Sequence, residues 1–184
     1  VGTFTRRRRA EDSLDERGDI MSALIKAEDE DGSRLSDREL RDQMITLLLA
    51  GHETTANSIA WAWERLTRTP DAEQELLDAV RGDREDRAEQ VEYVIQESMR
   101  SRPVVPIVGR RVQVPWRLGD FGVPAGTPVS ASIFLIHHRE DLYPKPWDFI
   151  PSRWVGHKPG TYEWIPFGGG TRRCAGAQLA MVEM

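Results

Sequence analysis

A long stretch without proline constrains the fold of this chain more than any other feature. After Ser36 no proline occurs until Pro70, and apolar residues recur in between at near-helical spacing. Ser36 and Glu39 form a capping box, in which each side chain satisfies a free backbone amide at a helix start. The sequence therefore predicts one helix that begins at Asp37 and extends for about 30 residues, or ~45 Å.

Two more helices are predicted after this long one, each from a start or stop signal. Pro70, followed by acidic residues, starts a helix that runs to about Val80, and another covers about 88–101 before Pro103. Beyond it, β-branched residues predict a small sheet of short strands at 107–114, 121–123 and 129–132, the last two flanking a turn at 124–126.

The C-terminal part of the chain is predicted to be irregular but packed. Residues 141–166 are too broken by proline for regular structure and too rich in tryptophan for a floppy linker, which predicts a packed meander. The apolar pattern of 179–184 is typical of a helix and has no stop signal. The predicted fold class is mainly α with a small β portion.

Composition excludes several functional classes. The chain has 184 residues, 39% hydrophobic and 30% charged, which is typical of soluble globular proteins. No apolar run approaches the roughly 18 residues that span a bilayer. The net charge of -5 and its interspersed signs argue against a nucleic-acid binder. The basic run at 6–9 is followed by acidic residues and is interpreted as a solvated segment. A single cysteine excludes intrachain disulfides and fits a reducing cytoplasm.

The strongest functional signal is the stretch 167–176, which contains Cys174. Three consecutive glycines let the backbone adopt positive φ angles and approach a flat macrocycle closely. Neighbouring amides and the positive end of a helix starting near Ala175 favour the thiolate form of the cysteine. Zinc and iron–sulfur sites would need a second cysteine, and a phosphate loop would need a Gly-Lys-Ser/Thr ending. The pattern indicates a metal-ligating thiolate, with a buried structural cysteine as the alternative.

This stretch resembles the signature of the cytochrome P450 family of haem-thiolate monooxygenases. The matching residues are Phe167, Gly170, Arg172, Cys174 and Gly176. The resemblance implies that haem b is the cofactor and that Cys174 ligates its iron. It places Phe167, Gly168 and Gly176 against the haem, and it makes Arg172 a charge-assisted partner of a haem propionate.

A second motif of the family lies within the long predicted helix, at Ala50, Gly51, Glu53 and Thr54. Gly51 thins the helix, and the Thr54 hydroxyl can bond to the Ala50 carbonyl, so the two open a polar notch. By resemblance, Ala50 and Gly51 border the dioxygen site, and Glu53 with Thr54 relays protons to the bound oxygen. The alternative is an ordinary amphipathic helix. A zinc-protease site is excluded because Ala56 occupies the position of the second histidine.

A third set of residues is expected to be structural. Glu97 and Arg100, spaced i and i+3, would by spacing alone be a weak surface pair. The resemblance joins them to Arg153, in the Pro-x-Arg segment of the meander, as a buried network that locks the meander to the cysteine loop. Its implied role is folding and haem retention rather than chemistry.

Three further residues are weaker candidates. The resemblance makes Arg110 a second propionate contact, with Arg111 as a one-residue ambiguity. His138 could contact a propionate or be a satisfied structural histidine. Arg173, expected to be exposed beside the loop, could help to dock an acidic electron donor.

The resemblance implies a function for the whole protein. Residues 1–184 would be part of one catalytic domain, without its N-terminal half and C-terminal tail, so a large apolar surface would be uncovered. The protein would insert one atom of dioxygen into a small hydrophobic organic substrate, with electrons from a ferredoxin or flavoprotein. A cytoplasmic bacterial enzyme is expected, although an N-terminal anchor is also compatible with the sequence. The competing hypotheses for function are a non-catalytic haem-binding protein, an inactive fragment, and an interaction module built on residues 6–9.

Overall fold

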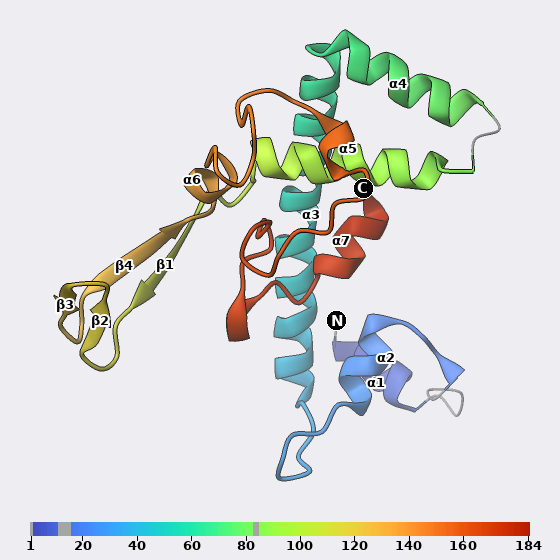
Figure 1. Cartoon of the computed structure of the whole chain (residues 1–184). Helices are drawn as coiled ribbons and strands as arrows, with labels where there is room; N and C mark the ends of the chain where they lie inside the picture. The colour runs from blue at the N-terminus through green and yellow to red at the C-terminus, as the bar shows by residue number, and fades with distance from the viewer. Residues whose placement is uncertain (1, 11–15, 83–84) are drawn as a thin grey trace. The chain divides into compact units, whose positions relative to one another are not determined.

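The computed structural model describes residues 2–10, 16–82 and 85–184, which form the helices and strands of Figure 1. The chain divides into two compact units, residues 1–53 and 54–184. The long helix α3 (Asp37–Thr67) contributes its first part to one unit and its last part to the other. Each unit has its own small hydrophobic core.

The long helix is as the sequence predicts. It has 31 residues, and the capping box at its start is formed. The Ser36 amide donates to Glu39 Oε2 over 2.9 Å, and the Glu39 amide donates to Ser36 Oγ over 3.3 Å. These hydrogen bonds hold the pKa of Glu39 below its usual value. The prediction of the helix and of its start is confirmed.

The first unit contains two helices that the sequence patterns did not indicate, α1 (Gly2–Arg9) and α2 (Ile20–Lys26). Asp19 caps α2 by accepting the Ser22 amide over 2.9 Å. The basic run is less solvated than expected, because Arg8 pairs with Asp19 and Arg9 pairs with Asp37. Two arginines of the run therefore hold this unit together. Its core consists of Met21, Leu24, Ile25, Leu35, Leu40 and Met44.

The second unit is organised around α5 (Arg87–Ser101). This helix contacts α4 (Pro70–Arg81), α6 (Ile133–His137) and the short 3-10 helix η2 (Pro151–Trp154). The core here joins α3, α4, α5 and the meander through Leu66, Ala72, Leu76, Val94 and Phe149. The predicted helices after α3 are confirmed, with ends within one residue of the expected positions.

The β portion forms two ladders instead of one small sheet. Strand β1 (Ile107–Arg111) pairs antiparallel with β4 (Pro128–Ser132), and β2 (Trp116–Leu118) pairs antiparallel with β3 (Phe121–Val123). In Figure 1 the β2–β3 hairpin lies at the end of the β1–β4 ladder that is remote from α6. The turn at 124–126 therefore connects strands of different ladders. Strand β2 was not predicted, and β1 ends before residue 114.

Helix α6 was also missed, because its apolar, β-branched sequence resembles a continuation of the preceding strand. The Ser132 side chain accepts the Leu135 amide over 3.2 Å and so starts a helix where β4 ends. After α6 the meander is packed, as predicted, with Tyr143, Phe149 and Trp154 buried.

The chain ends with η3 (Gly170–Arg172) and α7 (Ala177–Glu183), and α7 begins two residues later than expected. Among the described residues, no helix is long and apolar enough to cross a bilayer.

Candidate functional site

The cysteine loop, residues 167–176, is closed by its own backbone. The Cys174 amide donates to the Phe167 carbonyl over 2.9 Å, and the Arg173 amide donates to the Gly170 carbonyl over 3.1 Å. Gly168 and Gly170 have φ angles of 71° and 65°, which residues with a Cβ adopt only with strain. The glycines therefore have the conformational role that the sequence indicates.

Cys174 is exposed, which favours a metal-ligating thiolate over a buried structural cysteine. A Cβ added to Gly176 would lie 4.0 Å from Cys174 Sγ, and an added Cβ at Gly168 or Gly170 would meet no atom within 4 Å. Glycine at these positions keeps side-chain atoms away from the sulfur and from the surface of the loop. The sulfur is thus open to a large flat ligand.

The side chains that could ligate a metal near the loop fit haem. Within the described ranges, no cluster of three or more His, Cys, Asp or Glu residues could hold a metal ion. A lone exposed thiol suits an iron that brings its other ligands with it, as the iron of a porphyrin does. Arg172 and Arg173 are exposed beside Cys174, where a guanidinium can meet a carboxylate. Phe167 is half-buried against the ring edge of Trp164, with centroids 6.1 Å apart.

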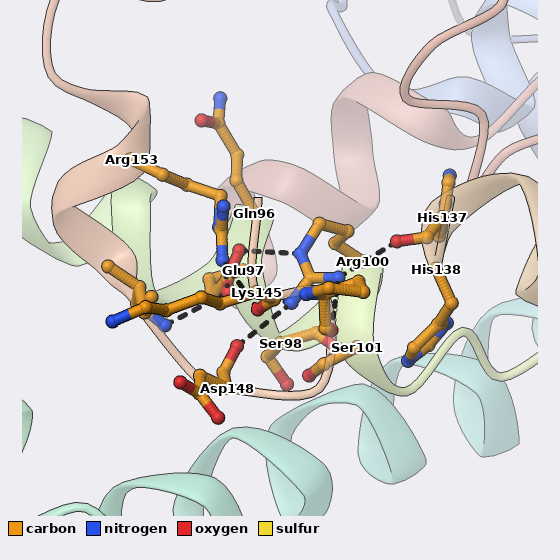
Figure 2. A network of polar contacts seen from close by, with 12 residues as sticks. Gln96, Glu97, Ser98, Arg100, Ser101, His137, His138, Lys145, Asp148 and Arg153 are labelled. Atoms are coloured by element: carbon orange, nitrogen blue, oxygen red, sulfur yellow. Dashed lines mark hydrogen bonds and ion pairs between the residues drawn. The ribbon is translucent and has the colours of Figure 1, made fainter. Parts of the chain in front are cut away.

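The structure brings Glu97, Arg100 and Arg153 together (Figure 2). Glu97 and Arg100 are both 0% exposed, and the guanidinium meets the carboxylate with two hydrogen bonds of 2.8 Å. Arg153 Nε donates to Glu97 Oε1 over 3.1 Å. The Glu97–Arg100 pair is therefore not the weak surface pair that spacing alone would give.

Glu97 has two further donors that sequence reasoning missed. The Ile150 amide donates to Oε1 over 2.9 Å, and the Trp154 indole donates to Oε2 over 3.1 Å. The indole could have been noticed, because Trp154 directly follows the arginine of the Pro-x-Arg segment. With five donors the buried carboxylate is saturated, which offsets its loss of hydration.

Arg100 and Arg153 also donate hydrogen bonds to backbone carbonyl groups of the meander. Arg100 donates to the Pro146 carbonyl over 2.8 Å and to the Asp148 carbonyl over 3.1 Å, and Arg153 donates to the Pro144 carbonyl over 3.1 Å. Between these prolines Lys145 has a φ of 52°, the only positive value outside glycine in the described chain. The network thus fixes the backbone of the meander as well as its side chains.

A second group of contacts links this network to the segment just before the cysteine loop, and the sequence did not reveal it. His137 Nε2 accepts the Ile165 amide over 2.9 Å, and Arg100 donates to the His137 carbonyl over 2.8 Å. Trp164 Nε1 donates to the Gln96 carbonyl over 3.1 Å. Burial lowers the pKa of His137 to about 4, so its imidazole is neutral.

His138 lies beside His137 in Figure 2 but has different contacts. Its Nδ1 bonds to the Phe134 carbonyl over 2.8 Å, and its ring stacks on Phe134 with centroids 4.1 Å apart. Burial lowers the pKa of His138. Its Nε2 is buried and has no hydrogen-bond partner in the part of the chain that the structure describes. The choice between a propionate contact and a structural histidine thus remains a prediction.

Arg110 and Arg111 are both exposed on β1. Arg110 donates to the Gly109 carbonyl over 2.8 Å, and Arg111 donates to the Gly126 carbonyl over 2.7 Å. Arg111 therefore has a role within the β ladder, whereas the Arg110 side chain, among the described residues, bonds to its neighbour Gly109. The propionate role of Arg110 stays a prediction.

The motif of the long helix, Ala50, Gly51, Glu53 and Thr54, lies in unbroken α3 and is exposed. The boundary between the two units falls in the sequence after Glu53. A Cβ added to Gly51 would meet no atom within 4 Å. The Thr54 carbonyl accepts the Ser58 hydroxyl over 2.9 Å, which gives this turn of the helix a polar side-chain contact. The predicted placement of the motif beside dioxygen stays a prediction.

Comparison with known protein families shows to which family this chain belongs. The family model described as Cytochrome P450 matches residues 2–184. The chain belongs to the cytochrome P450 family. The resemblance noted from the cysteine signature and the expected fold class are confirmed.

Relatives in mycobacteria are similar over almost the whole chain. A protein of Mycobacterium tuberculosis assigned the name cytochrome P450 137 is 43% identical over 178 residues, 96% of this chain and 37% of that protein. One of Mycobacterium bovis, assigned the name cytochrome P450 135B1, is 45% identical over 180 residues, 96% of this chain and 38% of that protein. The chain thus spans less than half the length of these cytochrome P450 relatives.

Solved cytochrome P450 structures share the arrangement of the chain. The cyanobacterial CYP120A1 with retinoic acid bound has a TM-score of 0.83 and 28% identity. The match covers 100% of this chain and 44% of the CYP120A1 chain. The haem domain of a cytochrome P450DA mutant has a TM-score of 0.82 and 27% identity, with coverage of 99% and 42%. The whole of this chain therefore has the cytochrome P450 fold.

Proposed function

We propose that the protein containing this chain is a haem-thiolate monooxygenase that oxidises a small hydrophobic organic molecule. The supporting observation is the exposed Cys174 in a loop whose glycines leave the sulfur accessible. The family model and the mycobacterial relatives support the same reaction class. The haem is proposed to be haem b, and the bacterial relatives support action inside a bacterial cell.

The residues of this chain have separate roles in the proposed reaction. When bound, haem would supply the iron chemistry that activates dioxygen, and the thiolate of Cys174 would donate electron density to that iron. Cys174 would hold the iron, and Phe167, Gly168 and Gly176 would contact the macrocycle. Arg172 and Arg110 bind propionates through charge-assisted hydrogen bonds.

Proton delivery is assigned to the long helix. Ala50 and Gly51 leave space for dioxygen, Thr54 holds a proton at its hydroxyl, and Glu53 passes protons from solvent to that hydroxyl. The presence of this pair disfavours a non-catalytic haem-binding protein.

The electron donor is proposed to be a ferredoxin or flavoprotein that docks near Arg173. This guanidinium is exposed directly beside the ligand cysteine, where it can attract an acidic partner. Arg173→Glu should slow reduction by the donor and leave the haem spectrum unchanged. Unchanged reduction kinetics would remove Arg173 from the docking surface.

Oxygen consumption tests the proposed function. The full-length protein, loaded with haem and supplied with electrons by a surrogate donor, is expected to consume dioxygen and hydroxylate at least one compound of a hydrophobic panel. Thr54→Val keeps the side-chain shape without the hydroxyl, so oxygen consumption should continue while hydrogen peroxide replaces product. Haem-loaded wild-type protein that consumes no dioxygen would instead favour a non-catalytic haem-binding protein.

The size and polarity of the substrate are proposed only as a class. One solved relative is described as having retinoic acid bound, which is a small, largely apolar molecule. We infer a hydrophobic organic substrate of this broad kind for the present protein.

A further inference from the structure

We propose that His137 is a positioning residue for the cysteine loop, whose neutral imidazole holds the backbone of Ile165 and thereby fixes the segment that enters the loop. The inference rests on the proposed haem-thiolate function. It adds a residue of α6 that lies far in sequence from the cysteine signature. His137 acts through the backbone and is not proposed to touch haem, dioxygen or substrate.

The first observation is the contact itself. His137 is completely buried, and its Nε2 accepts the Ile165 amide over 2.9 Å. Since an amide can only donate, Nε2 must be unprotonated and Nδ1 must hold the ring hydrogen. Nδ1 has no hydrogen-bond partner among the residues that are described. The Ile165 contact is thus the hydrogen bond that fixes Nε2 of this ring.

The second observation is a chain of hydrogen bonds from Ile165 to the cysteine. The Ile165 carbonyl accepts the amide of Gly168, the first glycine of the loop, over 2.9 Å. The carbonyl of neighbouring Phe167 accepts the Cys174 amide over 2.9 Å. Displacement of Ile165 would therefore be passed to the backbone of the ligand residue.

The third observation is that the segment 163–165 is held on three successive residues. Besides the Ile165 contact, Tyr143 donates its hydroxyl to the Glu163 carbonyl over 3.0 Å. The Trp164 indole donates to the Gln96 carbonyl over 3.1 Å. Of these three contacts, only the one from His137 depends on a group that titrates in mild acid. The indole of Trp164 does not titrate, and burial raises the pKa of Tyr143 above its ordinary value.

The surroundings of His137 keep it neutral. Burial lowers its pKa to about 4, and the positive charge of Arg100 on α5 acts in the same direction, as would a proton on His138 at the end of α6. The backbone of Arg100 and Met99 opposes this shift. The ring of Tyr143 from the meander packs at its edge, with centroids 6.3 Å apart. Buried Glu97 binds Arg100 and so offsets part of its charge.

Protonation would reverse the contact. A proton on Nε2 turns the acceptor into a donor that faces the Ile165 amide, so the hydrogen bond is lost. We therefore expect the cysteine loop to loosen in acid through His137, before the rest of the fold fails.

The experiment compares four full-length, haem-loaded proteins: wild type, His137→Gln, His137→Leu and His157→Gln. Glutamine keeps a neutral acceptor near the position of Nε2, whereas leucine removes it. His157 is the matched control, since it is an exposed histidine that pairs with Glu163 over 2.8 Å but does not contact Ile165. Hydrogen–deuterium exchange reports the Ile165 amide, and the reduced carbon-monoxide spectrum reports thiolate ligation between pH 8 and 4.

His137→Leu is expected to speed exchange of the Ile165 amide about tenfold at neutral pH, because one buried hydrogen bond is lost. His137→Gln should keep that protection and hold the thiolate band to a pH about one unit lower than wild type. His157→Gln should match the wild type in both measurements.

Unchanged Ile165 exchange in His137→Leu would overturn the proposal, and so would equal acid midpoints in His137→Gln and wild type. A wild-type protein without a thiolate band at any pH would instead contradict the proposed function. The exchange of Ile165 would then still decide whether His137 holds the segment.

Discussion

The Glu97 network and the cysteine loop lie in the same unit but are stabilised in opposite ways. In the network, buried side chains saturate each other, and all five N–H groups of Arg100 have acceptors. In the loop, backbone hydrogen bonds and two left-handed glycines set the path of the chain, and Cys174 stays exposed. Rigidity and reactivity are therefore assigned to different residues.

This difference explains how an exposed loop can keep a defined shape. The loop cannot bury its reactive sulfur without losing access to haem, so the order must come from its neighbours. The contacts of Tyr143, Trp164 and His137 with the segment 163–165 supply that order. The four predictions below test this division, from the largest expected effect to the smallest.

Glu97→Gln should have the largest effect. Loss of the charge leaves Arg100 buried without its counter-ion, and the free energy of unfolding should fall by about 4 kcal/mol. Urea unfolding of the holoprotein measures this change. Glu92→Gln is the control, because Glu92 is exposed on the same helix and accepts the side-chain amide of Gln96. A loss below about 1 kcal/mol would mean that the network is no stronger than a surface pair.

The pH dependence of stability should reveal His137. Its pKa is about 4 in the folded chain and 6.5 ordinarily, so the unfolded chain binds more protons between these values. The free energy of unfolding should therefore fall as pH decreases from 6.5 to 4, by up to about 3 kcal/mol from this group. Unfolding curves of wild type and His137→Gln across this window isolate the contribution. Parallel pH profiles would show that the imidazole is not protected from protonation.

Two tryptophans allow the Glu97 network to be compared directly with the contacts that hold the segment 163–165 before the cysteine loop. Trp154→Phe removes a donor to the Glu97 carboxylate and should cost about 2 kcal/mol, because bonds to charged groups are stronger. Trp164→Phe removes a donor to the neutral Gln96 carbonyl and should cost about 1 kcal/mol. Thermal unfolding at matched pH gives both values. A larger loss of stability in Trp164→Phe than in Trp154→Phe would show that the segment before the cysteine loop is held more strongly than the network.

Lys145→Gly should produce the smallest change and a stabilising one. Lys145 has a φ of 52°, which glycine adopts without a steric penalty, so a gain of about 0.5 kcal/mol is expected. Chemical denaturation of the variant beside Ser152→Gly tests this, because Ser152 is exposed and lacks a positive φ. Destabilisation by Lys145→Gly would show that the lysine side chain contributes more than its backbone strain costs.

The sequence predicted the features that are local in the chain. The capping box of α3 and the glycines of the cysteine loop depend on neighbouring residues and were predicted from them. Helix α6 was missed because the four apolar residues 133–136 fit a strand or a helix equally well, and the Ser132 cap decides between them.

The contacts of Glu97 required more than local patterns. Its pairing with Arg153 was expected only through the resemblance, since spacing alone indicates a weak pair. The contacts with Trp154 and Ile150 were not expected at all, because they join residues more than 50 positions apart. The same is true of His137, whose partner is a backbone amide that no sequence pattern marks.

The reduced carbon-monoxide difference spectrum of the full-length protein beside Cys174→Ala tests the central claim most directly. The account predicts a Soret band at the red-shifted position typical of thiolate ligation in the wild type, and loss of that band in the variant. A haem-loaded wild-type protein without this band, or a variant that keeps it, would contradict the assignment of Cys174 as the iron ligand.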